Sequence, residues 1–218
     1  MAKAPANCNR TLGRDARMGW PWASARLERL QMQQTQAFAA TLTERIDADA
    51  MLQQVQAWSA INTGTANLAG LAQQASALAD AFSDLPGEVE LVEPAPVTAI
   101  DAHGRAVEQP HARHIVLRVR PQANRRILLT GHMDTVFPAD HPFQAQHWLD
   151  QDTLNGPGVA DMKGGIAVML AALGAAEAAG TIGSLGYDVM INSDEETGSL
   201  ASAALIAQLA QGKLAALT

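Results

Sequence analysis

Histidine and acidic side chains occur in three short motifs that each follow a strand-like or glycine-rich segment. The motifs contain His132 and Asp134, then Asp161, then the run Asp194-Glu195-Glu196. Open α/β sheets bind their ligands at the carboxyl ends of strands, so we expect the three motifs to meet at one end of a sheet. One imidazole with several carboxylates is a ligand set that suits zinc or a similar divalent ion.

The first motif, Gly131-His132-Met133-Asp134, comes directly after the apolar run 126–130. Side chains two positions apart in an extended chain lie on one face. Asp134 can therefore accept a hydrogen bond from the imidazole nitrogen of His132 that is not bound to a metal. Such a partner fixes the tautomer and raises the basicity of the ligand. The alternative is a strand-end histidine beside an aspartate that only starts a turn.

The second motif, residues 155–165, is rich in glycine but does not fit a phosphate-binding loop. Asp161 stands where a dinucleotide fingerprint needs its third glycine, and Lys163 precedes its glycines instead of following one. What remains is an acidic residue on a tight turn at the start of a helix. The alternative is that Asp161 only caps that helix.

The third motif is the acidic run 194–196 after the apolar segment 187–192. The alternative interpretation of this acidic run is the start of a helix. Ser193-x-x-Glu196 fits a capping box, and acidic residues in a first turn complement the helix dipole. Three adjacent acids at the end of a buried strand nevertheless repel one another unless a cation lies among them. Taken together, the motifs favour two metals bridged by one carboxylate, which would polarise a carbonyl and supply a hydroxide. One of the paired glutamates would then stay off the metals as general base.

Hydrophobic periodicity predicts an α/β fold with helices on both faces of a sheet. Apolar residues at helical spacing predict a helix over 68–82, which Thr65 or Asn67 could cap. Further helices are expected at 41–59, 164–179 and 199–210, and strands at 88–92, 97–100, 114–120, 126–130 and 187–192. The helix at 164–179 is nearly all small or apolar residues, so we expect it to be buried on most sides.

Composition indicates a soluble globular protein and argues against two classes of partner. Hydrophobic residues make up 48% of the 218 residues, and we expect no apolar run as long as the roughly 18 residues of a membrane span. The net charge of −7 argues against nucleic acid, whose phosphates require a basic face. A single cysteine, Cys8, excludes an internal disulfide framework and favours a reducing, cytoplasmic location.

The first 31 residues differ from the rest of the chain in charge. They carry a net charge of +4, whereas the remaining residues carry −11. An Arg-rich, acid-poor segment is typical of an organelle transit peptide. We instead favour a non-native or disordered extension outside the fold, with translation starting at Met32.

The three motifs together resemble the M20 family of metallopeptidases, most closely its glutamate carboxypeptidase branch. The resemblance covers roughly residue 36 to the end and lies in His132-x-Asp134 with Val136-Phe137-Pro138, Gly156-Pro-Gly158-x-x-Asp161-Met-Lys-Gly-Gly165 and Asp194-Glu195-Glu196-x-Gly198-Ser199. It implies a zinc-exopeptidase-like three-layer sandwich, whose mixed, mostly parallel sheet is covered by helices on both faces. It also implies two Zn²⁺ ions, with Co²⁺ or Mn²⁺ as alternatives.

The same resemblance implies a role for each site residue. His132 binds one zinc and Asp134 orients His132, while Asp161 bridges the two metals and forms a cis peptide bond with Met162. Glu195 is the general base and Glu196 a ligand of the other zinc. The implied reaction is hydrolysis of a small peptide or N-acyl amino acid next to a free carboxylate. An N-acyl amino-acid deacylase of the same family is the alternative.

The family pattern also includes features for which we find no convincing position before Thr218. These are a further acidic ligand after the Glu-Glu pair, a late histidine ligand, and an inserted dimerisation domain that lends a histidine to the transition state. We therefore expect residues 32–218 to be the N-terminal portion of a catalytic domain, and this chain alone to be inactive and poorly soluble. The full-length form is expected to be a homodimer. A truncated product without catalysis is the competing hypothesis.

Overall fold

The computed structural model describes residues 21–218, with side chains from residue 32 onward. The described chain consists of two compact units that divide between Thr41 and Leu42. The first unit contains nearly all of helix α1 (Pro21–Thr43). Of the predicted extension 1–31, residues 1–20 lie outside the described residues and residues 21–31 begin α1. The predicted boundary at Met32 therefore stays a prediction.

A five-stranded sheet forms the centre of the second unit. Its order is β1-β4-β8-β5-β9, and its strands are β1 (Glu88–Val92), β4 (His114–Val119), β5 (Arg125–His132), β8 (Leu185–Asn192) and β9 (Ala216–Leu217). The predicted mixed α/β sheet is confirmed. The β1–β4 and β4–β8 pairs are antiparallel and the other two are parallel, so the sheet is evenly divided rather than mostly parallel. The reason is the short connection 120–124, which reverses the chain between β4 and β5.

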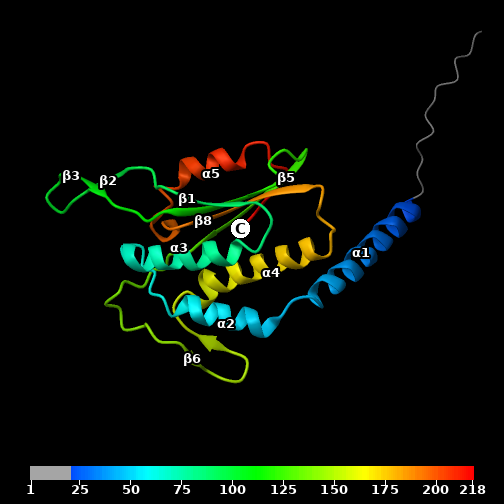
Figure 1. Cartoon of the computed structure of the whole chain (residues 1–218), viewed down its shortest axis with the longest axis horizontal. Helices are drawn as coiled ribbons and strands as arrows, with labels where there is room; N and C mark the ends of the chain where they lie inside the picture. The colour runs from blue at the N-terminus through cyan, green and yellow to red at the C-terminus, as the bar shows by residue number, and fades with distance from the viewer. Residues whose placement is uncertain (1–20) are drawn as a thin grey trace, which may run out of the picture. The chain divides into compact units, whose positions relative to one another are not determined.

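Helices cover both faces of this sheet, as Figure 1 shows. Helices α2 (Ala48–Ser59), α3 (Leu68–Phe82) and α4 (Gly164–Ala178) lie on one side and α5 (Ala203–Ala210) on the other. Alternate residues of β4 divide between two cores, because side chains along a strand point to opposite faces. Ile115 packs in the larger core, whereas Val116 packs with Leu209 in the smaller. The three-layer architecture is therefore confirmed.

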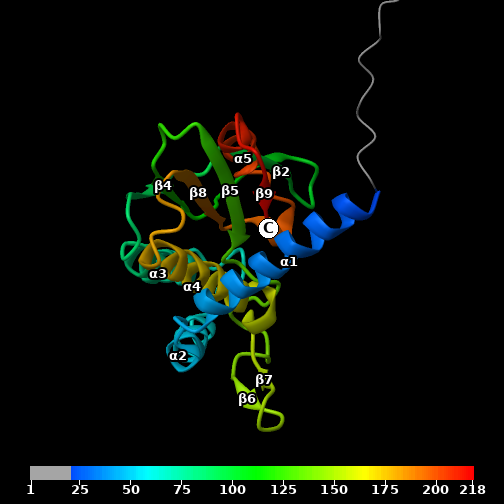
Figure 2. The same ribbon diagram turned by 90° about the vertical axis from the view of Figure 1, so that its right-hand side faces the viewer.

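Two short hairpins lie outside the main sheet. Strand β2 (Val97–Ile100) pairs with β3 (Ala106–Gln109), and β6 (His147–Trp148) pairs with β7 (Leu154–Asn155). Figure 2 shows the β6–β7 hairpin extending away from the sheet. Only β2 is predicted from the sequence, because the other three strands and β9 are short and largely exposed and therefore show no alternation.

Several predicted helices begin later than their sequence patterns suggest. The predicted helix 41–59 is interrupted, and α2 starts at Ala48 because the Asp47 side chain accepts a hydrogen bond from the amide of Ala50 at 3.0 Å. The predicted helix 199–210 starts at Ala203. A π-helical turn, η1 (Val159–Lys163), precedes α4, and a 3₁₀ turn, η2 (Glu195–Thr197), follows β8. Helix α3 and strands β1 and β2 have their predicted bounds.

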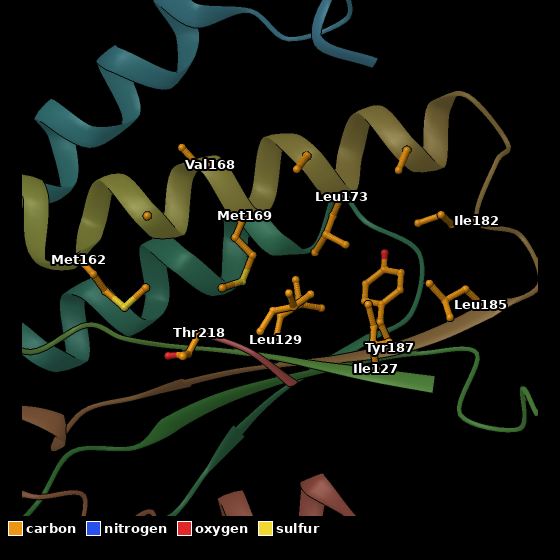
Figure 3. Close-up of a pocket in the computed structure, with 14 residues that line it drawn as sticks. Ile127, Leu129, Met162, Val168, Met169, Leu173, Ile182, Leu185, Tyr187 and Thr218 are labelled. Carbon is orange, nitrogen blue, oxygen red and sulfur yellow. The ribbon is translucent and has the colours of Figure 1, made fainter. Parts of the chain in front are cut away.

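Helix α4 is less enclosed than its composition predicts. Its buried residues pack in the larger core, but Val168 is 57% exposed. A mainly apolar cavity of about 370 Å³ lies between α4 and the sheet. Figure 3 shows Leu129, Met169 and Tyr187 directed into this space.

The segment Val159–Ala178 is long and apolar enough to cross a membrane by length and composition alone, contrary to the sequence expectation. Asp161 and Lys163 interrupt its first turn, so the uninterrupted apolar run is shorter than the helical segment. Core helices of soluble proteins meet the same criteria. Because Ile166, Ala167 and Leu173 pack against the sheet, we interpret α4 as a core helix.

Candidate metal centre

His132 is the last residue of β5 and is held between two carboxylates. It pairs with Asn192 at the end of β8, so the ends of two parallel strands meet here as predicted. Its Nδ1 lies 3.1 Å from the main-chain oxygen of Asp134 and 3.4 Å from Asp134 Oδ1. These acceptors favour a proton on Nδ1, which leaves Nε2 as the ligating nitrogen. Nε2 lies 2.9 Å from Asp161 Oδ1.

Asp134 is fully buried and joins the first motif to the third. Its Oδ1 accepts a hydrogen bond from the amide of Glu195 at 3.2 Å, and its Oδ2 accepts one from the amide of Glu196 at 3.1 Å. Oδ2 also accepts a hydrogen bond from the hydroxyl of Thr65 at 2.8 Å. Asp134 therefore positions the glutamate pair as well as His132.

Sequence reasoning missed this role of Thr65, which it considered only as a helix cap. Asn67 caps α3 instead, accepting from the amide of Gly70 at 3.2 Å. Thr65 is brought to the site by an isolated parallel bridge between Gly64 and Thr135. No local pattern around residue 65 indicates this long-range contact.

Asp161 lies on the turn between Gly158 and α4, and its peptide bond to Met162 is cis, as the family resemblance implied. The alternative of a helix cap does not hold, because α4 has Lys163 at its N-cap position and no side-chain cap bond. The side chain of Asp161 is 77% exposed and is free to bind a cation.

Lys163 anchors the same turn to α2. Its buried Nζ donates hydrogen bonds to the main-chain oxygens of Trp58 at 3.0 Å and Ile61 at 2.9 Å. Burial lowers the pKa of Lys163 to about 8. Lys163, which did not fit the phosphate-loop pattern, therefore makes structural hydrogen bonds rather than contacts with a ligand.

The three acids of the third motif do not all face the site. Asp194 is fully buried, and its Oδ2 accepts hydrogen bonds from the amides of Ala201 at 2.7 Å and Ser202 at 3.2 Å. The expected cluster of three repelling acids is therefore a pair, Glu195 and Glu196. The capping box is also absent, since the Ser193 hydroxyl donates to the oxygen of Ala112 at 2.7 Å.

His132, Glu195 and Glu196 each offer a ligand atom, and these atoms all lie within 4.8 Å of one another. Burial alone would lower the pKa of His132, but hydrogen bonds to Asp134 and Asp161 and the charge of Glu195 raise it to about 9. Burial raises the pKa of Glu196, the charge of His132 lowers it, and the neighbouring carboxylates raise it further.

The donor set fits a divalent metal ion. One imidazole nitrogen and carboxylate oxygens are the ligands that zinc binds in proteins, and the fixed Nδ1 of His132 gives the expected supporting contact. The group lies on a cavity of about 380 Å³ whose lining includes His132, Asp161 and Glu195. Asp161 contacts His132 but is not one of the three mutually close groups. Its assignment as the bridging ligand, and that of Glu195 as general base, stay predictions.

Comparison with known proteins finds a family that is similar to the segment containing these residues. Residues 128–217 match the model of peptidase family M20/M25/M40, and this match spans all three motifs. This segment is similar to peptidase family M20. Carboxypeptidase G2 of Pseudomonas sp. (strain RS-16) is 36% identical over 98 residues, which are 45% of this chain and 24% of that protein.

Solved structures support the fold of this chain. Human carnosine dipeptidase 1 is 21% identical with a TM-score of 0.62, over 77% of this chain and 38% of that one. The M20 metallo-carboxypeptidase Sso-CP2 of Sulfolobus solfataricus is 18% identical with a TM-score of 0.56, over 75% and 34%. The chain thus spans between about a quarter and two fifths of the length of the proteins that it matches.

Proposed function

We propose that the whole protein is a zinc-dependent hydrolase of peptide or amide bonds that acts, like a carboxypeptidase, next to a free carboxylate. The observation that carries the proposal is the approach of ligand atoms from His132, Glu195 and Glu196 to within 4.8 Å of one another. The family match and the similarity to carboxypeptidase G2 support this class of reaction. A small peptide or N-acyl amino acid is the proposed substrate, and the cytoplasm the proposed location.

Each site residue has a chemical task in this proposal. His132, Asp161 and Glu196 would hold the metal, which when bound supplies Lewis acidity and an acidic water. Asp134 holds His132 in the ligating tautomer and fixes the amides of Glu195 and Glu196. Glu195, with its side chain 53% exposed on the cavity, would accept a proton from the attacking water and return it to the leaving amine.

Metal binding is the first test, because the proposed hydrolysis depends on it. We expect calorimetric titration of the chain with Zn²⁺ to show saturable binding that is lost in His132→Ala and weakened in Glu196→Ala. Glu108→Ala is the matched control, because Glu108 is an exposed acid on β3 that lines neither cavity beside the candidate ligands. Binding that is insensitive to His132→Ala would contradict the proposed ligand set.

Hydrolysis is the second test. In any form of the protein that cleaves an N-acyl glutamate, we expect a chelator to abolish the activity and Glu195→Ala to remove it while metal still binds. Cleavage that survives the chelator would exclude the proposed mechanism. Comparing N-acyl glutamates with dipeptides distinguishes the carboxypeptidase from the alternative deacylase.

A further inference from the structure

A second cavity, of about 260 Å³, lies beside the metal-ligand candidates on the loop that follows β5. Asp161 lines both this cavity and the polar one described above, whereas Glu195 lines only the polar cavity and Glu196 only the second. The two cavities therefore adjoin each other at Asp161.

Apart from Asp161, Glu196 and Thr135, the wall of the second cavity is apolar and aromatic. Val136, Phe137 and Phe143 line it, and the rings of Phe137 and Phe143 pack edge to face with centroids 5.0 Å apart. The side-chain amide of Asn62 holds this loop in place by donating to the oxygen of Phe137 at 3.0 Å and to Gln144 Oε1 at 2.9 Å. The aromatic wall is thus a supported feature of the fold.

Thr135 adds a polar group that lacks a partner. The residue is 3% exposed and lines the cavity, yet its Oγ1 has no hydrogen-bond partner among the residues that the structure describes. Its amide is already satisfied by the oxygen of Thr63 at 2.9 Å. Buried hydroxyls are ordinarily hydrogen-bonded, so rotation of the Thr135 side chain toward the cavity would give this hydroxyl a partner in a bound molecule.

We propose that this cavity binds one uncharged, apolar side chain of the substrate, with the Thr135 hydroxyl bonded to the substrate main chain. The proposal rests on the proposed hydrolase function and names its specificity. The volume lies just below the usual range of pockets for whole drug-sized ligands, about 300–1,000 Å³, and suits a single side chain. No lysine or arginine lines the cavity in the described part of the chain, so an acidic side chain has no partner there.

The probes are N-acetyl-phenylalaninamide and N-acetylglycinamide, which differ only in the presence of an apolar side chain. Their binding to the chain, with and without added Zn²⁺, is measured by saturation-transfer NMR titration. We expect the phenylalanine probe to bind at least about tenfold more tightly, because it buries its ring. Equal affinity of the two probes would overturn the proposal.

Two valine variants locate the binding. Val136→Asp places a charge in the proposed cavity and should remove the preference for the phenylalanine probe. Val168→Asp is the matched control, because Val168 is similarly exposed, at 57% against 60%, but lines the other apolar cavity beneath α4. Phe143→Ala should weaken the same preference without adding charge. Loss of the preference in Val168→Asp and not in the other two would place the ligand elsewhere and overturn the proposal.

Thr135→Val tests the hydroxyl separately. We expect it to weaken both probes to a similar degree, while the melting temperature of the free protein does not fall, because the hydroxyl has no partner to lose. Unchanged affinity for both probes would remove Thr135 from the site. Zn²⁺ titration of the same samples reports independently on the hydrolase proposal, since failure to bind metal leaves the preference between probes measurable.

Discussion

Acidic residues of the same type have opposite environments in the three motifs. Asp134 and Asp194 are fully buried and accept hydrogen bonds from main-chain amides. Asp161 and Glu195 have largely exposed side chains near His132. The buried pair builds the loops, and the exposed pair is available to a ligand. Substituting a residue of the buried pair should therefore have different consequences from substituting a residue of the exposed pair.

Asp134→Asn tests the buried role. The asparagine side chain offers one acceptor oxygen where Asp134 uses two, so at least one of the donors Thr65 Oγ1, Glu195 N and Glu196 N loses its partner. Unpartnered buried groups cost about 1–3 kcal/mol each, and loss of a residue that orients a metal ligand costs about 10–100-fold in affinity. We expect both effects, measured by urea unfolding and Zn²⁺ titration.

Asp161→Asn provides the comparison, because the Asp161 side chain is exposed and its only hydrogen bond in the described chain is to His132. It should weaken metal binding while changing the free energy of unfolding by less than about 0.5 kcal/mol. If Asp134→Asn and Asp161→Asn lost equal stability, burial would not explain a difference between the structural role of Asp134 and the ligand role of Asp161.

At the scale of elements, the turn before α4 depends on a glycine. Gly158 has a φ of +71°, and a Cβ at this position would lie 2.9 Å from Thr135 Cγ2. Gly104 has a nearly equal φ of +75°, but a Cβ at that position would have no neighbouring atom within 4 Å among the described residues. The two glycines therefore share a positive φ and differ in their surroundings.

Gly158→Ala and Gly104→Ala separate these two contributions. Both should lose about 1–2 kcal/mol for the left-handed backbone, and Gly158→Ala should lose more because Thr135 or the turn must shift. The difference between their free energies of unfolding, measured in urea, gives the cost of the close approach. Equal losses would mean that the turn relaxes freely around the added methyl group.

The elements that the sequence predicts well are those with a strong local pattern. Helix α3 has its predicted bounds because its apolar residues repeat at helical spacing. Strand β8 ends at Asn192 as predicted, whereas β5 continues two residues beyond its predicted end and so brings His132 next to Asn192. Short exposed strands such as β3 have no such pattern. Thr65 and the inward direction of Asp194 depend on contacts between distant segments, which no local pattern encodes.

At the scale of the whole molecule, every buried hydrophobic residue of the described chain lies at Val55 or beyond. The unit Leu42–Thr218 therefore contains the complete set of core contacts that the structure describes. We expect deletion of residues 1–41 to change the free energy of unfolding by less than about 0.5 kcal/mol, the usual range for changes away from a core. Urea unfolding of the shortened and full chains checks this, and a lower midpoint for the shortened chain would assign the first unit a stabilising role.

The carboxylate of Asp134 links the hydroxyl of Thr65 to the amides of Glu195 and Glu196. Those two amide protons belong to a surface turn, yet they exchange with solvent only when their hydrogen bonds to the buried Asp134 carboxylate break. In deuterium oxide they should therefore exchange slowly for a turn whose side chains are exposed. Thr65→Val should speed the exchange of these two amide protons, although Thr65 is distant from them in the sequence. Deuterium uptake at Glu195 and Glu196 would therefore report on the hydrogen bond that Thr65 makes just before α3.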